Sequence, residues 1–297
     1  MAGVSAPPLI SLQDILVATD FSPCSRIALH CAAVLARQAK GTVFLAHVLP
    51  CAPMSPVPMD AGPVFPVTIA KNPRFRMKQL VSSPDMAGIG HETLLGQGDL
   101  WPVLRGMIEE NHIELVVIGT HGREGLKKLV LGSVAEEVFR SAPCPVVTVG
   151  PHVAPECFEH GRLRRVLFAT DFLPNSLHAL THAVSLAQLH QASLSVVHAI
   201  PCTTPHEDFG PTTPTDEEIS AARSQALYLL PDGVQADVIV EAGLPDQVIV
   251  EVARRQKASM IVIGLHPQKS AFLAEHLPWT TAHHVVCDAH CPVMTVK

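Results

Sequence analysis

The chain has 297 residues, about twice the length of a common domain, so two domains are the starting expectation. Hydrophobic residues make up 47% of the chain and charged residues 16%, which favours compact folded units over extended disorder. The formal net charge is -6 with Lys and Arg scattered, which argues against a nucleic-acid-binding surface. No apolar run approaches the roughly 20 residues that span a bilayer, so no membrane contact is expected.

The N-terminal residues and the cysteines indicate the compartment. Residues 1–20 lack the basic stretch and apolar core of a secretion signal, so we expect a cytoplasmic protein. Cysteines such as Cys31 and Cys144 lie in apolar stretches, as buried reduced thiols do, and this disfavours a disulfide framework.

The chain repeats itself, and the repeat predicts its architecture. Residues 15–21 (ILVATDF) return as residues 166–172 (VLFATDF), and each copy is followed by a turn and an amphipathic stretch. Further pairs follow in the same order: 42–48 with 193–199, 94–98 with 239–243, 115–119 with 260–264, and 144–149 with 291–296. Both halves therefore contain the same series of elements.

Each copy contains about five short, almost continuously apolar strands separated by helical segments, a pattern typical of parallel strands covered on both faces. We predict an α/β protein of two tandem doubly wound, Rossmann-like domains, each with a five-stranded parallel sheet and a ligand crevice at the carboxyl ends of its strands. We expect domains at 1–150 and 164–297, joined by an exposed linker at 151–163, where Pro, Gly and charged residues interrupt the apolar pattern. The irregular stretches 50–73 and 201–214 are interpreted as surface loops, with lids over the crevice as the alternative.

A glycine motif follows the fourth strand of the first half. Its spacing is Gly119-x2-Gly122-x9-Gly132-Ser133, and the last pair opens a predicted helix. Glycine lets backbone amides approach a phosphate, and a helix N-terminus adds N–H donors and the positive end of the dipole. The motif therefore predicts an anion site at the sheet edge.

These features together resemble the ATP-binding branch of the universal stress protein family. The resemblance rests on the ATDF strand end, His47-Val48, the glycine motif and the closing CPVVTV, and it covers both halves. It implies strand order 3-2-1-4-5 and dimerisation through the fifth strands, so the two halves would pair within one chain, with a further homodimer open.

By this resemblance the first half would bind ATP, or a related adenine nucleotide, together with Mg²⁺. Ala18, Thr19 and Asp20 would lie at the nucleoside, and Val48 would meet the adenine through its backbone. The implied phosphate-side residues are Gly119, Gly122, Gly132, Ser133, Val134 and Ala135. The implied role is that of a nucleotide-dependent stress-response regulator.

The second half departs from the motif. It keeps Gly264 and Asp171, but Pro267 replaces the second glycine, and Trp279-Thr280 stands in place of the Gly-Ser pair. Proline removes a backbone donor, and tryptophan fills space that a phosphate needs. We expect this pocket to be empty, or to hold a ligand other than ATP.

Other functions compete with nucleotide binding. The chain has no Gly-x4-Gly-Lys-Ser/Thr loop, Gly-x-Ser-x-Gly elbow or His-Glu-x-x-His helix, so no catalytic residue is assigned. A slow ATPase or another nucleotide-using enzyme stays open, as does a scaffold that binds nothing. The histidines and cysteines of residues 283–291 suggest a transition-metal site, but alignment of Cys291 with Cys144 favours packing, and no metal ligand is assigned.

Overall fold

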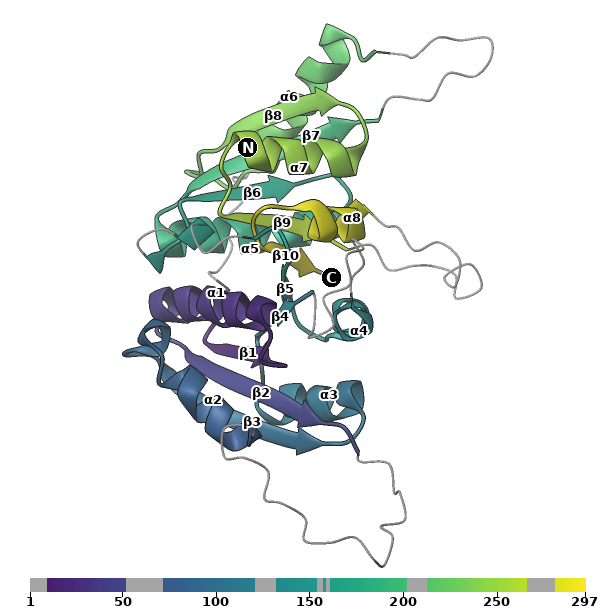
Figure 1. The fold of residues 1–297 in the computed structure, drawn as a ribbon. Helices are drawn as coiled ribbons and strands as arrows, with labels where there is room; N and C mark the ends of the chain where they lie inside the picture. The colour runs from purple at the N-terminus through teal and green to yellow at the C-terminus, as the bar shows by residue number, and fades with distance from the viewer. Residues whose placement is uncertain are drawn as a thin grey trace, which may run out of the picture.

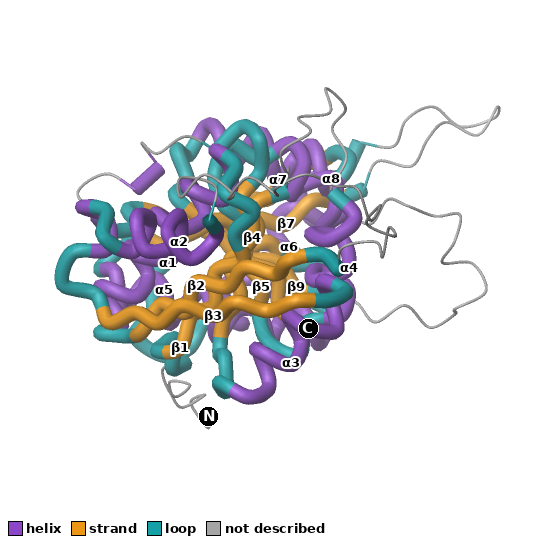
Figure 2. Tube along the Cα trace, turned by 60° about the horizontal axis from the view of Figure 1, so that its bottom comes forward, coloured by secondary structure: helices purple, strands orange, loops and turns teal. Residues whose placement is uncertain are grey.

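The computed structural model describes residues 10–51, 72–120, 132–153, 157–158, 161–201, 213–265 and 281–297. Strands form the central layer, with helices on both sides (Figure 2). Among the described helices, none combines the length and apolarity needed to cross a bilayer.

The two halves contain corresponding elements in the same order (Figure 1). In the first half these are β1 (Asp14–Ala18), α1 (Pro23–Ala39), β2 (Thr42–Leu49), α2 (Pro73–Val81), β3 (Gly90–Gln97), α3 (Leu100–Glu110), β4 (Leu115–Gly119), α4 (Ser133–Ser141) and β5 (Val146–Val149). In the second half they are β6 (Arg165–Ala169), α5 (Pro174–His190), β7 (Ser193–Ile200), α6 (Asp216–Leu229), β8 (Asp237–Ala242), α7 (Pro245–Arg255), β9 (Met260–Gly264), α8 (Thr281–Asp288) and β10 (Val293–Val296).

All ten strands belong to one sheet, in the order β3-β2-β1-β4-β5-β10-β9-β6-β7-β8. Neighbouring strands within each half are parallel, and the order in each half is 3-2-1-4-5 by its own count. The halves meet where β5 and β10 pair antiparallel, with Val147 opposite Met294. This is the α/β, Rossmann-like architecture that the repeat predicts.

The strands alternate between two hydrophobic layers. Ile15 and Val17 of β1 face the layer that contains α1 and α5, whereas Leu16 faces the layer that contains α3, α4, α7 and α8. All three side chains have no exposed surface, as expected of strands covered on both faces. Each layer contains residues of both halves, so the apolar packing continues across the β5–β10 joint.

The linker differs from the sequence prediction of an exposed segment. Val153, Phe158 and Leu163 are all buried, and the ring of Phe158 lies 5.5 Å from that of His30 in α1. Burying these apolar side chains against the layer of α1 and α5 is more favourable than leaving them in water, so these residues of the linker pack on the domains.

Candidate functional site

The turn that follows β1 is held in shape by its own side chains. Phe21 adopts a left-handed backbone conformation, with φ of 67°, and its N–H donates to Oγ1 of Thr19 at 3.0 Å. The N–H of Ser22 donates to Oδ1 of Asp20 at 2.9 Å, which fixes the Asp20 carboxylate at the carboxyl edge of the sheet. Ser22 then caps α1, since its hydroxyl accepts from the N–H of Ser25 at 3.2 Å.

The Asp20 carboxyl group is tuned toward its charged form. Burial raises its pKa, but hydrogen bonds from the side chain and backbone of Ser22 and from Ser25 outweigh this effect, so the pKa lies below its ordinary value. Asp20 is therefore a carboxylate at neutral pH, able to accept hydrogen bonds from a ligand or to face a cation.

The end of β2 adds backbone groups to the same edge. The N–H of Thr19 donates to the carbonyl of Ala46 at 2.9 Å, and β1 has no further strand pairing with β2 beyond this point. Peptide groups alternate in direction along a strand, so those of Val48 face the same side as those of Ala46, past the end of β1. His47, next to Val48, places Nδ1 at 2.7 Å from the carbonyl oxygen of Thr19.

The end of β4 approaches α1 closely. A Cβ on Gly119 would lie 3.1 Å from the carbonyl carbon of Cys24, so a side chain here would press on the start of the helix. Thr120 is buried, and its N–H donates to the carbonyl of Val149 at 3.0 Å. The glycine thus allows the β4 edge and the β1 turn to lie next to each other.

Gly132 lies next to the end of β4. Its N–H donates to the carbonyl of Thr120 at 3.0 Å, and it is the N-cap residue of α4. Glycine has no side chain that could accept hydrogen bonds from the N–H groups of the first turn. Gly132 therefore leaves the positive N-terminal end of the helix, where Ser133 and Val134 lie, without a side-chain cap of its own. Ala135 is buried against the sheet.

The structure brings together most of the residues that the sequence predicts for the site. Ala18 pairs with both Ala46 of β2 and Ile118 of β4, so the β1 turn, the β2 end and the β4 end share one edge. Gly122 lies outside the described residues. The hydrogen bonds of Thr120, Ser22 and Ser25 were not predicted. The duplicated Thr-Asp-Phe-x-Pro-x-Ser pattern is a signal for Ser25 alone, because Ser22 corresponds to Leu173.

The second half repeats the turn but closes the edge more tightly. Phe172 has φ of 63°, its N–H donates to Oγ1 of Thr170 at 3.0 Å, and that hydroxyl lies 3.0 Å from Oγ of Ser176. Nδ2 of Asn175 donates to the carbonyl of Leu265 at 2.5 Å, a bridge for which Cys24 in the first half has no amide.

The corresponding glycine is more crowded in this half. A Cβ on Gly264 would lie 2.5 Å from the carbonyl oxygen of Asn175. Pro267, Trp279 and Thr280 lie outside the described residues.

The histidine and cysteine cluster does not form a metal centre in the part of the chain that is described. Nδ1 of His283 lies 3.9 Å from Sγ of Cys287, whereas Nδ1 of His284 lies 2.7 Å from Asp246 of α7. Within the described ranges, no three or more His, Cys, Asp or Glu side chains are grouped to hold a metal ion.

A family profile and several curated relatives indicate one family. The sequence profile of the universal stress protein family matches residues 12–150 and again residues 162–297. A universal stress protein A homologue of Coxiella burnetii is 31% identical over 146 residues, covering 46% of this chain and 95% of its own length. A universal stress protein of Methanocaldococcus jannaschii is 26% identical over 138 residues, covering 46% of this chain and 81% of its own length.

A solved structure extends the likeness to both halves. A protein of unknown function from Pseudomonas aeruginosa superposes with a TM-score of 0.64 at 22% identity, over 97% of this chain and 93% of its own. At this identity the likeness shows the fold alone, and it shows it for the whole tandem chain.

Proposed function

This chain belongs to the universal stress protein family, and we propose that its first half binds ATP, accompanied by Mg²⁺, at the edge formed by the ends of β2, β1 and β4. Occupancy of this site would make the chain a nucleotide-dependent regulator in a stress response. The domain boundaries proposed for it are 1–150 and 164–297, with the linker at 151–163.

The observation that carries the proposal is the position of Gly132. Its N–H bonds to Thr120 at the end of β4, so the N-terminus of α4 lies at the carboxyl edge of the sheet. The N-cap residue of α4 is a glycine, which has no side chain to occupy the first N–H groups, so this helix N-terminus offers donors and a positive dipole end to a phosphate chain. The hydroxyl of Ser133 adds one donor, and the small Gly132 leaves room for the phosphates.

The nucleoside end of the ligand is assigned to Asp20 and Val48. A charged carboxylate beside the sheet edge suits the hydroxyl donors of a ribose, and the outward peptide groups of Val48 suit the alternating donors and acceptors of an adenine edge. Mg²⁺ would enter with the nucleotide, because triphosphate oxygens are the hard ligands that it prefers.

The second half is proposed to be without ATP. Asn175 joins the start of α5 to the end of β9. A Cβ added at Gly264 would lie closer to the backbone of α5 than a Cβ added at Gly119 would lie to the backbone of α1. We propose that this half responds to nucleotide binding in the first half. The response would pass through the β5–β10 pairing, which takes the place of a dimer contact between separate chains.

Calorimetric titration with ATP and Mg²⁺, with phosphate release followed in the same samples, tests the proposal. A regulator binds saturably with little turnover. Rapid phosphate release would favour the hypothesis that the protein is an ATPase. The absence of binding heat at millimolar ATP would favour the hypothesis that it is a scaffold that binds no nucleotide.

A further inference from the structure

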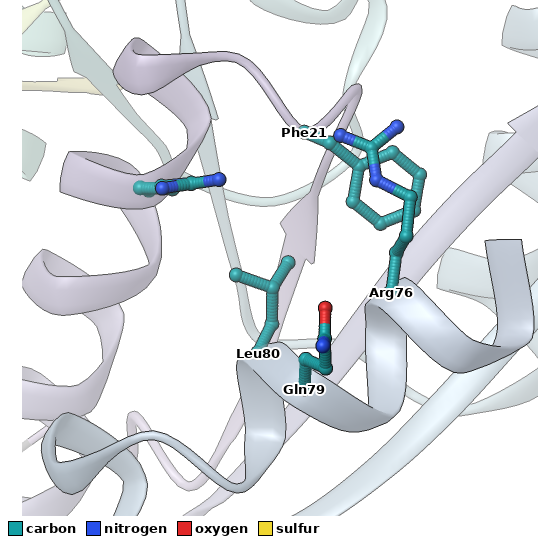
Figure 3. Close-up of a pocket in the computed structure, with 5 residues that line it drawn as sticks. Phe21, Arg76, Gln79 and Leu80 are labelled. Atoms are coloured by element: carbon teal, nitrogen blue, oxygen red, sulfur yellow. The ribbon is translucent and has the colours of Figure 1, made fainter. Parts of the chain in front are cut away.

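The β1 turn, on the nucleoside side of the proposed site, is held by residues of the first half. Arg76 of α2 lies over the ring of Phe21, with 4.0 Å between its guanidinium carbon and the ring centroid (Figure 3). This cation–π contact fixes a residue of the turn that presents Asp20. On the phosphate side, α4 makes a contact of a different origin.

Lys297, which follows β10 in the second half, reaches the C-terminal end of α4. Its Nζ donates to the carbonyl oxygen of Arg140 at 2.6 Å and to that of Ala142 at 2.9 Å. The last carbonyls of a helix have no partners within the helix, and a lysine there binds them and offsets the negative end of the dipole. In Figure 1 the end of the chain lies beside α4. A side chain of the second half therefore caps a helix of the first half.

The backbone of Lys297 is itself fixed to the second half. Its backbone oxygen lies 2.8 Å from Nδ1 of His178 on α5. The preceding residue, Val296, pairs with Gly264 of β9. The lysine side chain thus starts from a backbone held by both a strand and a helix, so it connects α4 to a fixed point of the other half.

The corresponding position of the first half has no side chain that could cap α8. The duplicated strands 144–149 and 291–296 place Gly150 at the position of Lys297. A Cβ on Gly150 would lie 2.8 Å from the carbonyl oxygen of Val286 and 3.8 Å from that of Ala289, at the end of α8. By the same alignment Ala289 corresponds to Ala142. The lysine therefore serves only the helix that begins with the Gly-Ser pair.

We propose that Lys297 is a positioning residue for the nucleotide site: by holding the C-terminal end of α4, it sets where the N-terminal end lies against β4. This inference rests on the function proposed for the first half. α4 has 9 residues, a length of about 13 Å. A single charge at that distance is largely screened at physiological salt, where the Debye length is about 8 Å. The lysine thus acts through the position of the helix, which is read at the bond between Gly132 and Thr120.

Substitution of Lys297 in the full chain tests this role. Lys297→Met removes the ammonium group and should lower ATP affinity about 10-fold, as expected for the loss of a charge-assisted contact. The Gly132 amide should exchange with solvent about 10-fold faster, because the end of α4 is less firmly held. Lys297→Arg keeps the charge and the donors and should retain most of the affinity. Arg223→Met, at an exposed position on α6, is the matched loss of charge and should change neither quantity.

Hydrogen exchange followed by NMR separates positioning from general stability. The Thr170 amide, bonded to Val197 in the second half, is the internal reference. Equal acceleration at Gly132 and Thr170 in Lys297→Met would indicate general destabilisation and overturn the proposal. Unchanged Gly132 exchange would also overturn it, as would unchanged affinity where the wild type binds ATP. If the wild type binds no ATP, the proposed function fails, and faster exchange at Gly132 alone would still support the hold of Lys297 on α4.

Discussion

Nδ1 of His47 lies 2.7 Å from the carbonyl oxygen of Thr19, and the histidine ring packs on Phe21 with 4.5 Å between ring centroids. A carbonyl only accepts, so Nδ1 carries the proton and donates it. A side chain of β2 thereby anchors the turn that presents Asp20. His198 makes the same contact to Thr170, at 2.8 Å.

His47→Ala should loosen the β1 turn. We expect a loss of about 1–2 kcal/mol in unfolding free energy, because the buried Thr19 carbonyl loses its donor. ATP affinity should fall several-fold with it, since Asp20 is no longer held in place. Urea unfolding and calorimetric titration measure the two effects.

His198→Ala is the matched control for this change. It removes the corresponding bond in the second half, so it should lower stability by a similar amount and leave ATP affinity intact. If both variants weaken ATP binding equally, the assignment of the nucleotide to the first half is wrong.

Gly132→Trp should abolish ATP binding in a folded protein. Gly132 has a φ of -60°, which other residues adopt, and a Cβ would lie 3.0 Å from the Thr120 carbonyl. We expect a stability cost of about 1–3 kcal/mol and a loss of ATP affinity of at least about 100-fold, because the side chain fills the space proposed for phosphate. Circular dichroism melting and calorimetry measure these quantities.

Gly106→Trp provides the same substitution away from the proposed site. A Cβ at Gly106 in α3 meets no atom within 4 Å, so the larger side chain has open space. This variant should bind ATP like the wild type. Unchanged ATP affinity in a folded Gly132→Trp protein would refute the phosphate site at α4.

The repeat in the sequence was sufficient to predict the α/β class and the paired halves, because apolar runs such as 115–119 and 260–264 are local signals. Burial of the linker was not predictable, since Pro and Gly in 151–163 say nothing about where Phe158 packs. The Asn175 bridge was also missed, because its acceptor, Leu265, is 90 residues away in the chain. Contacts of this kind depend on the assembled sheet edge.

His190 should make stability depend on mildly acidic pH. It is 1% exposed at the end of α5, and Nδ1 accepts from the N–H of Leu163 at 3.2 Å. Burial lowers its pKa from 6.5 to about 4, so the unfolded chain binds a proton first. Its contribution is full above pH 6.5 and is lost as the pH falls toward 4, with a loss of about 2 kcal/mol between pH 7 and pH 5.

Urea unfolding at these two pH values checks the contribution of His190. His190→Gln keeps an acceptor without a titrating ring, so its stability should depend less on pH by this amount. His91→Gln, at an exposed position on β3, should keep the wild-type dependence. An equal pH dependence in wild type and His190→Gln would show that His190 is not the group responsible.

Cysteine labelling should separate exposed from buried thiols. Cys51 is exposed, whereas Cys31 and Cys291 are buried, and burial raises the pKa of both buried thiols far above the ordinary range. Only the thiolate reacts, so iodoacetamide at pH 8 should label Cys51 at least about 100-fold faster than either. Peptide mass spectrometry measures the rates, and comparable labelling of all three in the folded protein would contradict this packing.

The nucleotide content of the folded chain tests the central claim most directly. The wild type and Gly132→Trp are incubated with ATP and Mg²⁺, passed through a desalting column and denatured, and the released nucleotide is quantified by mass spectrometry. The account predicts about one adenine nucleotide per wild-type chain and almost none for the variant. Two nucleotides per chain, or one that persists in Gly132→Trp, would contradict it.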